Sequence, residues 1–379
     1  MDPVFIIGTG LAGYTLAKEL RRGGWDAPLV LVTADDGRYY SKPMLSSALS
    51  QGKDEAGLTQ ADAVGMARDL AAEVWTRKEV TAIDPAAHLL TVGGESHRYG
   101  HLVLALGSSP IRLPLKGDGA GEVLSVNNLS DYGRFLSRLQ GAKRVAIIGP
   151  GLIGCEFAND LLVSGRSVTL IGPDKWPIGT LVPEAAGRAV QRALVAHGAT
   201  WHLETFNGPV ERRGSGLATL LGNGSLVEAE VVLSAVGVRP VTALASAAGL
   251  AVNRGIVTDR FLRTSAADVY ALGDCAEVDG RLLPFVAPLM VAARALAKTL
   301  AGIQTPVVYP LMPVAIKTSL HPVVVLPPPP GIEGGRWDVR ESGAGVAGRY
   351  VEPSGKLRGF ALTGGAVAEK NVLVREMSA

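Results

Sequence analysis

The sequence is poor in cysteine, in net charge and in long apolar runs, and each shortage excludes a class of protein. Its cysteines are Cys155 and Cys275, with no CxxC pair, which argues against a disulfide framework and a cysteine-built zinc site. A formal net charge of +2 without a basic block gives no support for nucleic-acid binding. No uncharged apolar stretch reaches the roughly 18 residues of a membrane span, and no signal-like segment comes before the first predicted strand. We therefore expect a soluble, cytoplasmic protein without a membrane span.

Glycine and apolar residues, by contrast, are plentiful. A chain of 379 residues is too long for one ordinary core, so two or three domains are expected. Its 47% hydrophobic and 19% charged residues are typical of a globular protein. The 47 glycines fit a fold with many strand-to-helix turns, where the backbone must come close to a ligand.

Two glycine-rich segments each lie between an apolar run and a helix-like stretch. Residues 8–13 follow Val4–Ile7, and residues 149–154, with Pro150 between the first two glycines, follow Arg144–Ile148. In such a fingerprint the first glycine permits a tight turn, the second lets the backbone approach a pyrophosphate, and the third allows close helix–strand packing. Two fingerprints predict two bound dinucleotides and electron transfer between them. The predicted contacts are Gly8, Thr9, Gly10, Leu11, Ala12 and Gly13 in the first segment, and Gly149, Gly151, Leu152, Ile153 and Gly154 in the second.

The ribose of each dinucleotide is expected to meet an acid about 20 residues after the fingerprint. For the first segment Asp35 is the candidate, with Thr33 and Ala34 as backbone neighbours of the adenosine, although Asp35 and Asp36 could instead only cap a turn. The second segment has no carboxylate at the expected position and no arginine cluster for a 2′-phosphate, a role for which Lys175 is a lone candidate. The sequence thus favours NADH over NADPH only slightly.

The strand and helix pattern around the two segments repeats at the scale of a domain. A strand, a helix and a second strand are predicted at 4–33 and again at 144–171, and glycine-ended buried strands follow at 102–107 and 230–237. This repeat indicates duplication of a nucleotide-binding domain. Towards the end of the chain, short β-like runs and the proline run 327–330 indicate a small β-rich domain, with the prolines in a loop or polyproline II segment.

Three further segments resemble the two-dinucleotide flavoprotein reductase superfamily. Residues 102–110 and 231–240 are similar to its two crossover segments, and residues 264–274 to its second flavin motif. A closer resemblance is to the bacterial rubredoxin reductases, and the flavorubredoxin reductases of nitric oxide detoxification share much of it. The segments that carry it are residues 39–46, 151–160, 270–277 and 313–318.

The resemblance implies an α/β fold with two Rossmann-like domains, which bind FAD and NAD, and a small C-terminal α+β domain. The FAD-binding domain would comprise residues 1–112 and 240–310, the NAD(P)H-binding domain residues 113–239, and the C-terminal domain residues 311–379. The implied cofactors are non-covalent FAD and NADH. The implied partner is rubredoxin, an acidic protein that accepts one electron at a time.

The resemblance also assigns residues to the flavin. Asp274 would hold the ribityl chain, a role compatible with a helix N-cap. By the resemblance, Lys42 and Glu156 would lie near the flavin ring as a pair. A cation there would stabilise the anionic reduced ring, and the carboxylate could bind that lysine and shape the nicotinamide pocket. A surface lysine and a solvated helix glutamate are the alternative for these two. Three more flavin contacts are carried over from the family: Val80, Val286 and Lys317.

Residues 42–47 contain no cysteine, although disulfide-reducing members of the superfamily have a redox cysteine pair here and peroxide-reducing members a single cysteine. Cys155 and Cys275 are predicted to be packed core residues rather than reactive thiols. Without a thiol relay, electrons must leave from the flavin edge, which favours an outer-sphere, one-electron acceptor. We therefore expect hydride transfer from NADH to FAD, followed by transfer of single electrons to the iron of rubredoxin.

Three alternatives stay open. The acceptor could be flavorubredoxin, or a ferredoxin that serves a related chain. A peroxide or disulfide reductase is disfavoured by the missing cysteine. A non-enzymatic alternative is an NADH-sensing flavoprotein that acts through protein contacts.

Overall fold

The computed structural model describes residues 2–329, 331–343 and 345–378. The chain divides into two compact units. Unit 1 comprises residues 1–42, 57–109 and 238–310, and unit 2 comprises residues 43–56, 110–237 and 311–379. Each unit contains one of the two glycine-rich segments. Within the described part of the chain, no helix combines the length and the apolar content that a membrane span needs.

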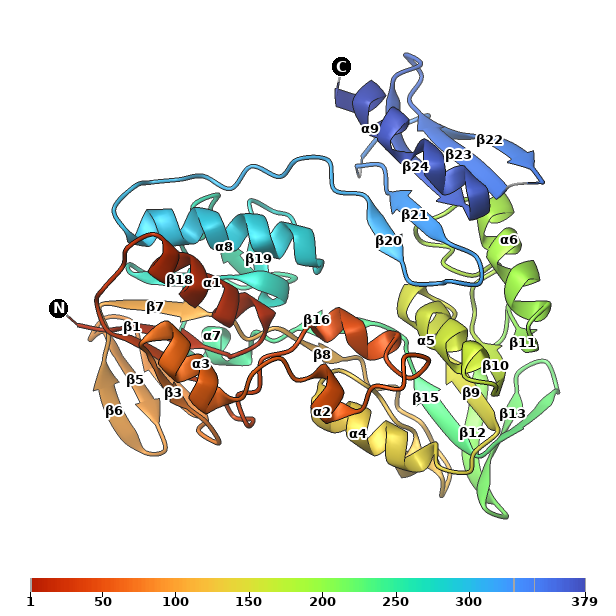
Figure 1. The fold of residues 1–379 in the computed structure, drawn as a ribbon, viewed down its shortest axis with the longest axis horizontal. Helices are drawn as coiled ribbons and strands as arrows, with labels where there is room; N and C mark the ends of the chain where they lie inside the picture. Colours follow the sequence, from red (N-terminus) through yellow and green to blue (C-terminus); the bar gives the residue numbers. More distant parts are fainter. Residues whose placement is uncertain (1, 330, 344, 379) are drawn as a thin grey trace. The chain divides into compact units, whose positions relative to one another are not determined.

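Unit 1 is built on a five-stranded sheet in the order β18-β7-β1-β2-β3, with parallel pairing throughout. Its central strands are continuous apolar runs because helices cover both faces of a parallel sheet. Helices α1 and α8 pack side by side, as Figure 1 shows. The sheet strands are β1 (Val4–Ile7), β2 (Leu29–Val32), β3 (Glu73–Trp75), β7 (His101–Leu104) and β18 (Val269–Ala271).

The remaining elements of unit 1 surround this sheet. Strands β4, β5 and β6 form a small antiparallel sheet, and β17 pairs with β19. Their bounds are Val80–Asp84, Leu89–Val92, Glu95–Arg98, Ile256–Thr258 and Ala276–Val278. The helices are α1 (Leu11–Arg22), α3 (Ala63–Leu70), α7 (Ala243–Ala247), α8 (Val286–Leu300) and the short 3₁₀ turn η3 (Gly273–Cys275). The 3₁₀ turn η1 (Lys42–Ser46) begins at the last residue of the first segment of unit 1 and continues in unit 2. The short strands β8 (Ser108–Pro110) and β16 (Val238–Pro240) and helix α2 (Glu55–Leu58) lie near the sequence boundaries of the units.

Unit 2 repeats the pattern with a four-stranded parallel sheet in the order β11-β10-β9-β15. An antiparallel sheet of β12, β13 and β14 accompanies it. The strands are β9 (Arg144–Ile148), β10 (Ser167–Ile171), β11 (Ala199–His202), β12 (Asn207–Arg213), β13 (Gly216–Leu221), β14 (Leu226–Ala229) and β15 (Val231–Ser234). The helices are α4 (Leu129–Arg138), α5 (Leu152–Val163), α6 (Glu184–Val195) and the turn η2 (Ala120–Glu122).

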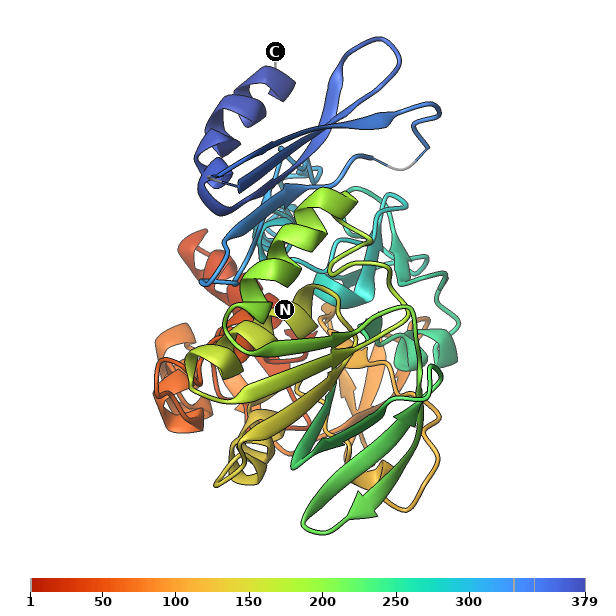
Figure 2. The same cartoon turned by 90° about the vertical axis from the view of Figure 1, so that its right-hand side faces the viewer.

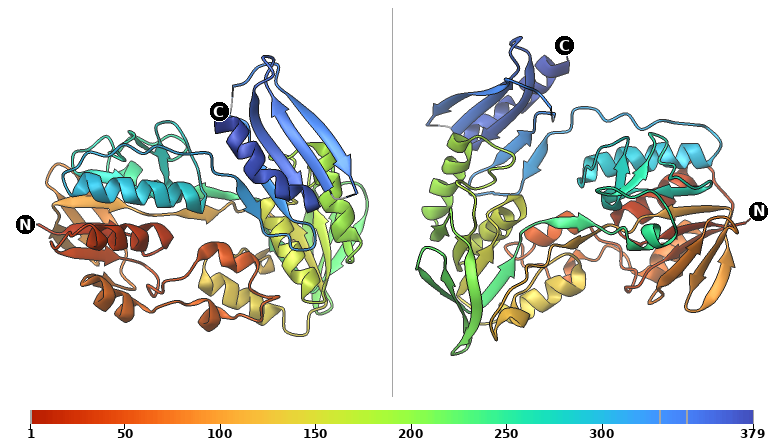
Figure 3. Two further views of the ribbon diagram at one scale, coloured as in Figure 1. Left: turned by 45° about the horizontal axis from the view of Figure 1, so that its top comes forward. Right: turned by 180° about the vertical axis from the view of Figure 1, so that it is seen from behind.

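The C-terminal part of unit 2 is a five-stranded antiparallel sheet in the order β20-β21-β24-β23-β22. Helix α6 lies against β23 and β24 (Figure 2), and α9 (Lys370–Ser378) packs on β24 along one face of the sheet (Figure 3). The other bounds are Val314–Ile316 for β20, Val323–Leu326 for β21, Arg336–Ser342 for β22, Gly345–Val351 for β23, Leu357–Thr363 for β24 and Gly364–Glu369 for η4.

The predicted α/β class, with two Rossmann-like folds and a small C-terminal α+β domain, is confirmed. Residues 327–329 follow β21 without regular structure, as predicted, and Pro330 lies outside the described residues. The boundaries of the three predicted domains stay a prediction.

Candidate functional site

The first glycine-rich turn connects β1 to α1 in unit 1. Gly8 has φ +113°, and a Cβ built on it would lie 2.3 Å from the carbonyl oxygen of Ala105. A Cβ on Gly13 would lie 1.9 Å from the carbonyl oxygen of Gly8. Gly10, the N-cap of α1, differs, because no described atom beyond its chain neighbours comes within 4 Å of its built Cβ. The packing of the protein itself therefore requires glycine at positions 8 and 13. At Gly10 the backbone leaves open space, which fits a pyrophosphate at a helix N-terminus.

The second turn connects β9 to α5 in unit 2 and has the same design. Gly149 has φ +107°, and its built Cβ would lie 2.7 Å from the carbonyl oxygen of Ala235. A Cβ on Gly154 would lie 1.9 Å from the carbonyl oxygen of Gly149, while around Gly151 the described chain again leaves 4 Å of open space. The Pro150 carbonyl accepts a hydrogen bond of 2.9 Å from the backbone N–H of Ile178. This turn also fits a dinucleotide pyrophosphate.

Asp35 lies just beyond β2, beside the first turn. Its Oδ1 accepts hydrogen bonds from Thr33 Oγ1 at 2.7 Å and from the backbone N–H of Gly37 at 2.9 Å. Thr9 Oγ1, in the glycine-rich turn, lies 3.5 Å from the same oxygen. Asp35 therefore caps its own turn and at the same time lies against the first nucleotide turn, so the two predicted roles are compatible. Ala34 lies between these two side chains in the same loop.

Asp274, in the last chain segment of unit 1, belongs to a polar cluster. Ser108 Oγ donates to Asp274 Oδ2 at 2.9 Å, and Lys42 Nζ lies 4.0 Å from the same oxygen. A Cβ built on the preceding Gly273 would lie 2.9 Å from Cβ of Ala12, next to the first turn. The structure thus brings Lys42 and Asp274 together. Ser108 was missed by the sequence analysis, although it directly follows the glycine that ends the first crossover strand.

Glu156 lies on α5 and is only 1% exposed. It accepts hydrogen bonds from Ser46 Oγ and, at 2.9 Å, from the backbone N–H of Lys317, and it forms an ion pair with Lys317 Nζ. The alternative of a solvated helix glutamate is therefore wrong. Lys42 belongs to unit 1 and Glu156 to unit 2, so their predicted pairing stays a prediction, as does the contact of Glu156 and Lys317 with the flavin.

Two neighbours of Glu156 on α5 hold the same pair of chain segments. Asp160 accepts hydrogen bonds from the backbone N–H groups of Leu49 at 2.9 Å and Ser50 at 3.0 Å, and burial raises the pKa of this carboxyl. Asn159 Nδ2 donates to Ser319 Oγ at 3.1 Å, and its Oδ1 accepts from the backbone N–H of Leu320 at 2.9 Å. One helix therefore fixes both the segment around residues 46–50 and the segment 317–320.

The two valines predicted as flavin contacts differ in exposure. Val80 begins β4 and is buried in the hydrophobic core of unit 1. Val286 is the first residue of α8 and is 39% exposed. Contact of either with a flavin stays a prediction.

Both cysteines are free and completely buried, which confirms that they are packed core residues. Burial raises the pKa of the Cys275 thiol to about 11 and raises the pKa of Cys155 as well. Since the thiolate is the reactive form, neither thiol suits a redox relay at neutral pH.

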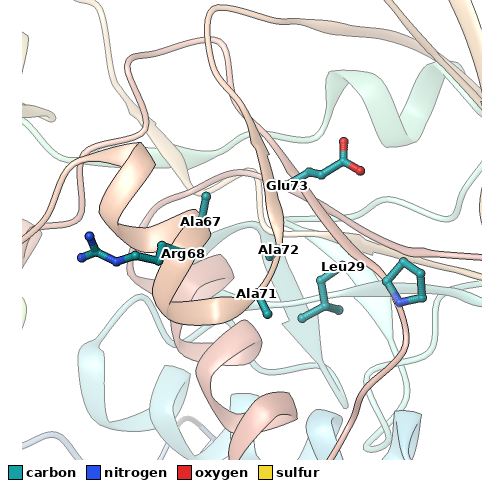
Figure 4. A pocket seen from close by; sticks show the side chains of 7 residues that line it. Leu29, Ala67, Arg68, Ala71, Ala72 and Glu73 are labelled. Atoms are coloured by element: carbon teal, nitrogen blue, oxygen red, sulfur yellow. The ribbon is translucent and has the colours of Figure 1, made fainter.

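A surface pocket in unit 1 lies at the wrong end of the sheet for a dinucleotide. Figure 4 shows the side chains that line it, among them Leu29 at the start of β2 and Glu73 at the start of β3. In parallel sheets ligands bind beyond the carboxyl ends of the strands, where Asp35 and the glycine-rich turn lie. The pocket is lined by Pro28, Leu29, Ala67, Arg68, Ala71, Ala72 and Glu73.

Comparison with known families agrees with this geometry. Residues 2–299 match the model of the pyridine nucleotide-disulphide oxidoreductases. The chain belongs to this family. Membership implies flavin and nicotinamide cofactors, as the two turns predict. Residues 306–377 match the rubredoxin binding C-terminal domain.

Curated relatives match the chain along its whole length. It is 48% identical to a rubredoxin-NAD(+) reductase of Alcanivorax borkumensis, with 100% of this chain and 99% of the relative covered. It is 34% identical to a nitric oxide reductase FlRd-NAD(+) reductase of Vibrio vulnificus, with 100% and 98% covered. The resemblance inferred from the motifs is thereby confirmed.

The fold is also that of a solved ferredoxin reductase from Rhodopseudomonas palustris. The two structures agree with a TM-score of 0.88 at 24% identity, with 98% of this chain and 93% of the other covered. At this identity the agreement supports the fold alone.

Proposed function

We propose that the chain is an NADH-dependent flavoprotein that passes electrons by way of FAD to rubredoxin. The observation that carries the proposal is the match of residues 306–377 to a rubredoxin-binding domain, attached to a two-dinucleotide reductase fold whose cysteines are both buried. The 48% identity to a rubredoxin-NAD(+) reductase over the full length favours this acceptor over flavorubredoxin, whose reductase is 34% identical.

The residues of unit 1 suit a bound FAD. The turn 8–13 would hold its pyrophosphate, Asp35 its adenosine ribose, and Asp274 its ribityl chain. FAD supplies the change from two-electron to one-electron transfer. Lys42, next to Asp274, places a cation in this cluster, where it would stabilise a negative charge on the reduced ring.

The residues of unit 2 suit NADH and the protein partner. The turn 149–154 would hold the pyrophosphate of NADH and so position its nicotinamide for hydride transfer, since alignment is the main contribution a protein makes to this step. Rubredoxins are acidic, and this chain has a sequence pI of about 8.5, so opposite charge would speed their encounter at low salt. The cytoplasmic location expected from the sequence is part of this proposal.

Stopped-flow absorbance of the purified protein tests the proposal. We expect a yellow protein that releases FAD on denaturation, is bleached by NADH, and then reduces rubredoxin at a rate that falls as salt is added. A colourless protein would contradict the flavin assignment. Faster turnover with purified flavorubredoxin or a ferredoxin than with rubredoxin would make that protein the acceptor. Very slow bleaching by NADH with a long-lived charge-transfer band would favour the NADH-sensing alternative.

A further inference from the structure

The two nucleotide folds can be aligned through one equivalent hydrogen bond. The backbone N–H of Gly8 donates to the carbonyl of Val32 at 2.8 Å, and the N–H of Gly149 donates to the carbonyl of Ile171 at 2.8 Å. Val32 and Ile171 are therefore equivalent, and each is the last residue of its strand. Three residues further on, the first fold has Asp35 and the second has Asp174.

Gly172, the first residue after β10, is enclosed by Pro150. A Cβ built on Gly172 would lie 2.2 Å from Cδ and 2.8 Å from Cγ of Pro150. Real Cβ atoms do not come this close to other heavy atoms, so the proline ring excludes every side chain from position 172. Beside Pro150, the position directly after β10 therefore has no room for an acidic side chain of its own.

The carboxylate of Asp174 lies next to this excluded position. Its Oδ2 is 3.5 Å from the Cβ built on Gly172. The side chain thus folds back over Gly172 and brings its charge to the end of β10. This charge also reaches α5, since Asp174 contributes to the raised pKa of Cys155.

Asp174 differs from Asp35 in that no described residue donates a hydrogen bond to its carboxylate. Over residues 2–329, 331–343 and 345–378, the Asp174 carboxylate receives no hydrogen bond and forms no ion pair, although its residue is half-buried. Asp35 is held by Thr33 Oγ1 and the N–H of Gly37, but Gly172 stands in the place of Thr33 and offers no hydroxyl. An ionised carboxylate only accepts hydrogen bonds, so a ligand that donates hydroxyl groups suits Asp174 and a phosphate is repelled.

We propose that Asp174 is the residue that selects NADH over NADPH, by accepting hydrogen bonds from the adenosine ribose hydroxyls of NADH and repelling the 2′-phosphate of NADPH. This inference rests on the proposed function, because it assigns the second turn to a nicotinamide nucleotide. The sequence left two interpretations of the second turn, one without a ribose acid and one with Lys175 binding a 2′-phosphate. The inference replaces both with Asp174, an acid two residues beyond the excluded position 172.

The test compares Asp174→Asn with a control, Glu204→Gln. Glu204 is exposed, and its backbone N–H donates to the backbone carbonyl of Asp174, so the control removes a carboxylate from a neighbouring loop. The second-order rate constant of flavin bleaching is measured by stopped flow with NADH and with NADPH, without any acceptor, and the ratio of the two constants is compared between the variants. We expect Asp174→Asn to lower this ratio roughly 10- to 100-fold, the usual effect of one charge-assisted hydrogen bond, mainly through a higher apparent Kd for NADH. Glu204→Gln is expected to change the ratio less than about 2-fold.

Calorimetric titration with NAD⁺ and NADP⁺ keeps this test separate from electron transfer. Loss of NAD⁺ preference in Asp174→Asn would support the assignment even if rubredoxin proved not to be the acceptor. An unchanged preference in Asp174→Asn, or an equal loss in Glu204→Gln, would overturn the assignment. Loss of NADP⁺ binding in Lys175→Ala together with tighter NADP⁺ than NAD⁺ binding by the unaltered protein would overturn it in favour of Lys175.

A rescue sharpens the structural part of the argument. In the Asp174→Asn background, Pro150→Ala together with Gly172→Asp restores an acid at the end of β10 and removes the ring that excludes it. We expect this triple variant to regain most of the NADH preference, and Gly172→Asp without Pro150→Ala to lower thermal stability. Failure of the triple variant to regain preference, while it folds and binds flavin, would contradict the proposed geometry.

Discussion

The two glycine-rich turns have nearly the same backbone but different surroundings. In both, the third glycine would place a Cβ 1.9 Å from the carbonyl oxygen of the first. After the second strand of its fold, unit 1 has Thr33, whose hydroxyl donates to Asp35. At the equivalent place unit 2 has Gly172, next to the Pro150 ring, and Asp174, which has no donor among the residues that the structure describes. The comparison teaches that the fold sets where a pyrophosphate can bind, while the residues beside the turn set which nucleotide is accepted.

The largest expected effects on cofactor binding come from Gly13 and Gly154, the last glycines of the two turns. Gly13→Ala and Gly154→Ala each force a methyl group into a backbone carbonyl, and overpacking of this kind costs about 1–3 kcal/mol or more. If the two turns serve different nucleotides, Gly13→Ala loses the flavin, whereas Gly154→Ala keeps a yellow protein that NADH reduces poorly. Flavin absorbance per protein and the KM for NADH measure this. The matched control is Gly151→Ala, whose Cβ meets open space, so its melting temperature should be unchanged while its KM for NADH rises.

The second prediction compares the two ion pairs. Lys317→Met leaves the buried Glu156 carboxylate without its cation, and breaking a buried pair in this way costs about 3–5 kcal/mol. Lys42→Met should cost less than about 1 kcal/mol, because Lys42 and Asp274 are 4.0 Å apart and both partly exposed. Urea unfolding of the two variants gives the values. Equal losses would show that burial is not what separates the two pairs.

Removing both Glu156 and Lys317 refines this prediction. The double variant Glu156→Gln/Lys317→Met leaves no unpaired charge at position 156, so it should be more stable than Lys317→Met alone. A double variant that is less stable than both single variants would contradict a dominant desolvation cost.

The third prediction concerns Lys42 and function rather than stability. Lys42→Ala should make the flavin harder to reduce and slow hydride transfer several-fold, because a cation beside the ring stabilises the reduced form. Redox titration and stopped-flow reduction by NADH measure these effects. Lys53→Ala is the charge-matched control, because it removes a partly exposed lysine of unit 2 whose backbone carbonyl accepts from Tyr132 Oη. An unchanged potential and rate in Lys42→Ala would remove Lys42 from the flavin site.

The smallest effect is expected from the cysteines. The pKa of Cys275 is raised to about 11 in the folded protein, above the ordinary value of about 8.5, so the neutral thiol is favoured. The neutral Cys275 thiol therefore makes its full contribution to folding stability below pH ~8.5, and this contribution is lost as the pH rises towards 11. Native protein at pH 8 should resist thiol alkylation, and Cys155→Ala and Cys275→Ala should each retain NADH–rubredoxin turnover. Loss of turnover in a variant that remains folded would revive a thiol relay.

Much of the fold could be predicted from local patterns. The apolar run Val4–Ile7 is a strand and the stretch Leu11–Arg22, with charges on one side, is a helix, each with the predicted bounds. Gly8 follows the strand directly, and Gly10 and Gly23 cap the helix. Apolar runs of this kind are buried wherever they lie, so their structure depends little on distant residues.

The site was harder to predict from the sequence than the fold, because its contacts join distant parts of the chain. Glu156 is paired with Lys317, 161 residues away, and no local pattern encodes that distance. The hydroxyl partners Ser46 and Ser108 were missed, since serines are common and only their placement distinguishes them. Asp174 was passed over because spacing along the sequence does not reveal that Pro150 displaces the acid.

Helix α5 carries a consequence for how this chain can vary. Its N-cap Gly151 belongs to the nucleotide turn, and Glu156, Asn159 and Asp160 hold two segments that are some 270 residues apart in sequence. One inserted residue between Gly151 and Glu156 would rotate the rest of the helix by about 100° and detach both segments at once. The length of α5 between the turn and Asp160 therefore cannot change without loss of the whole arrangement.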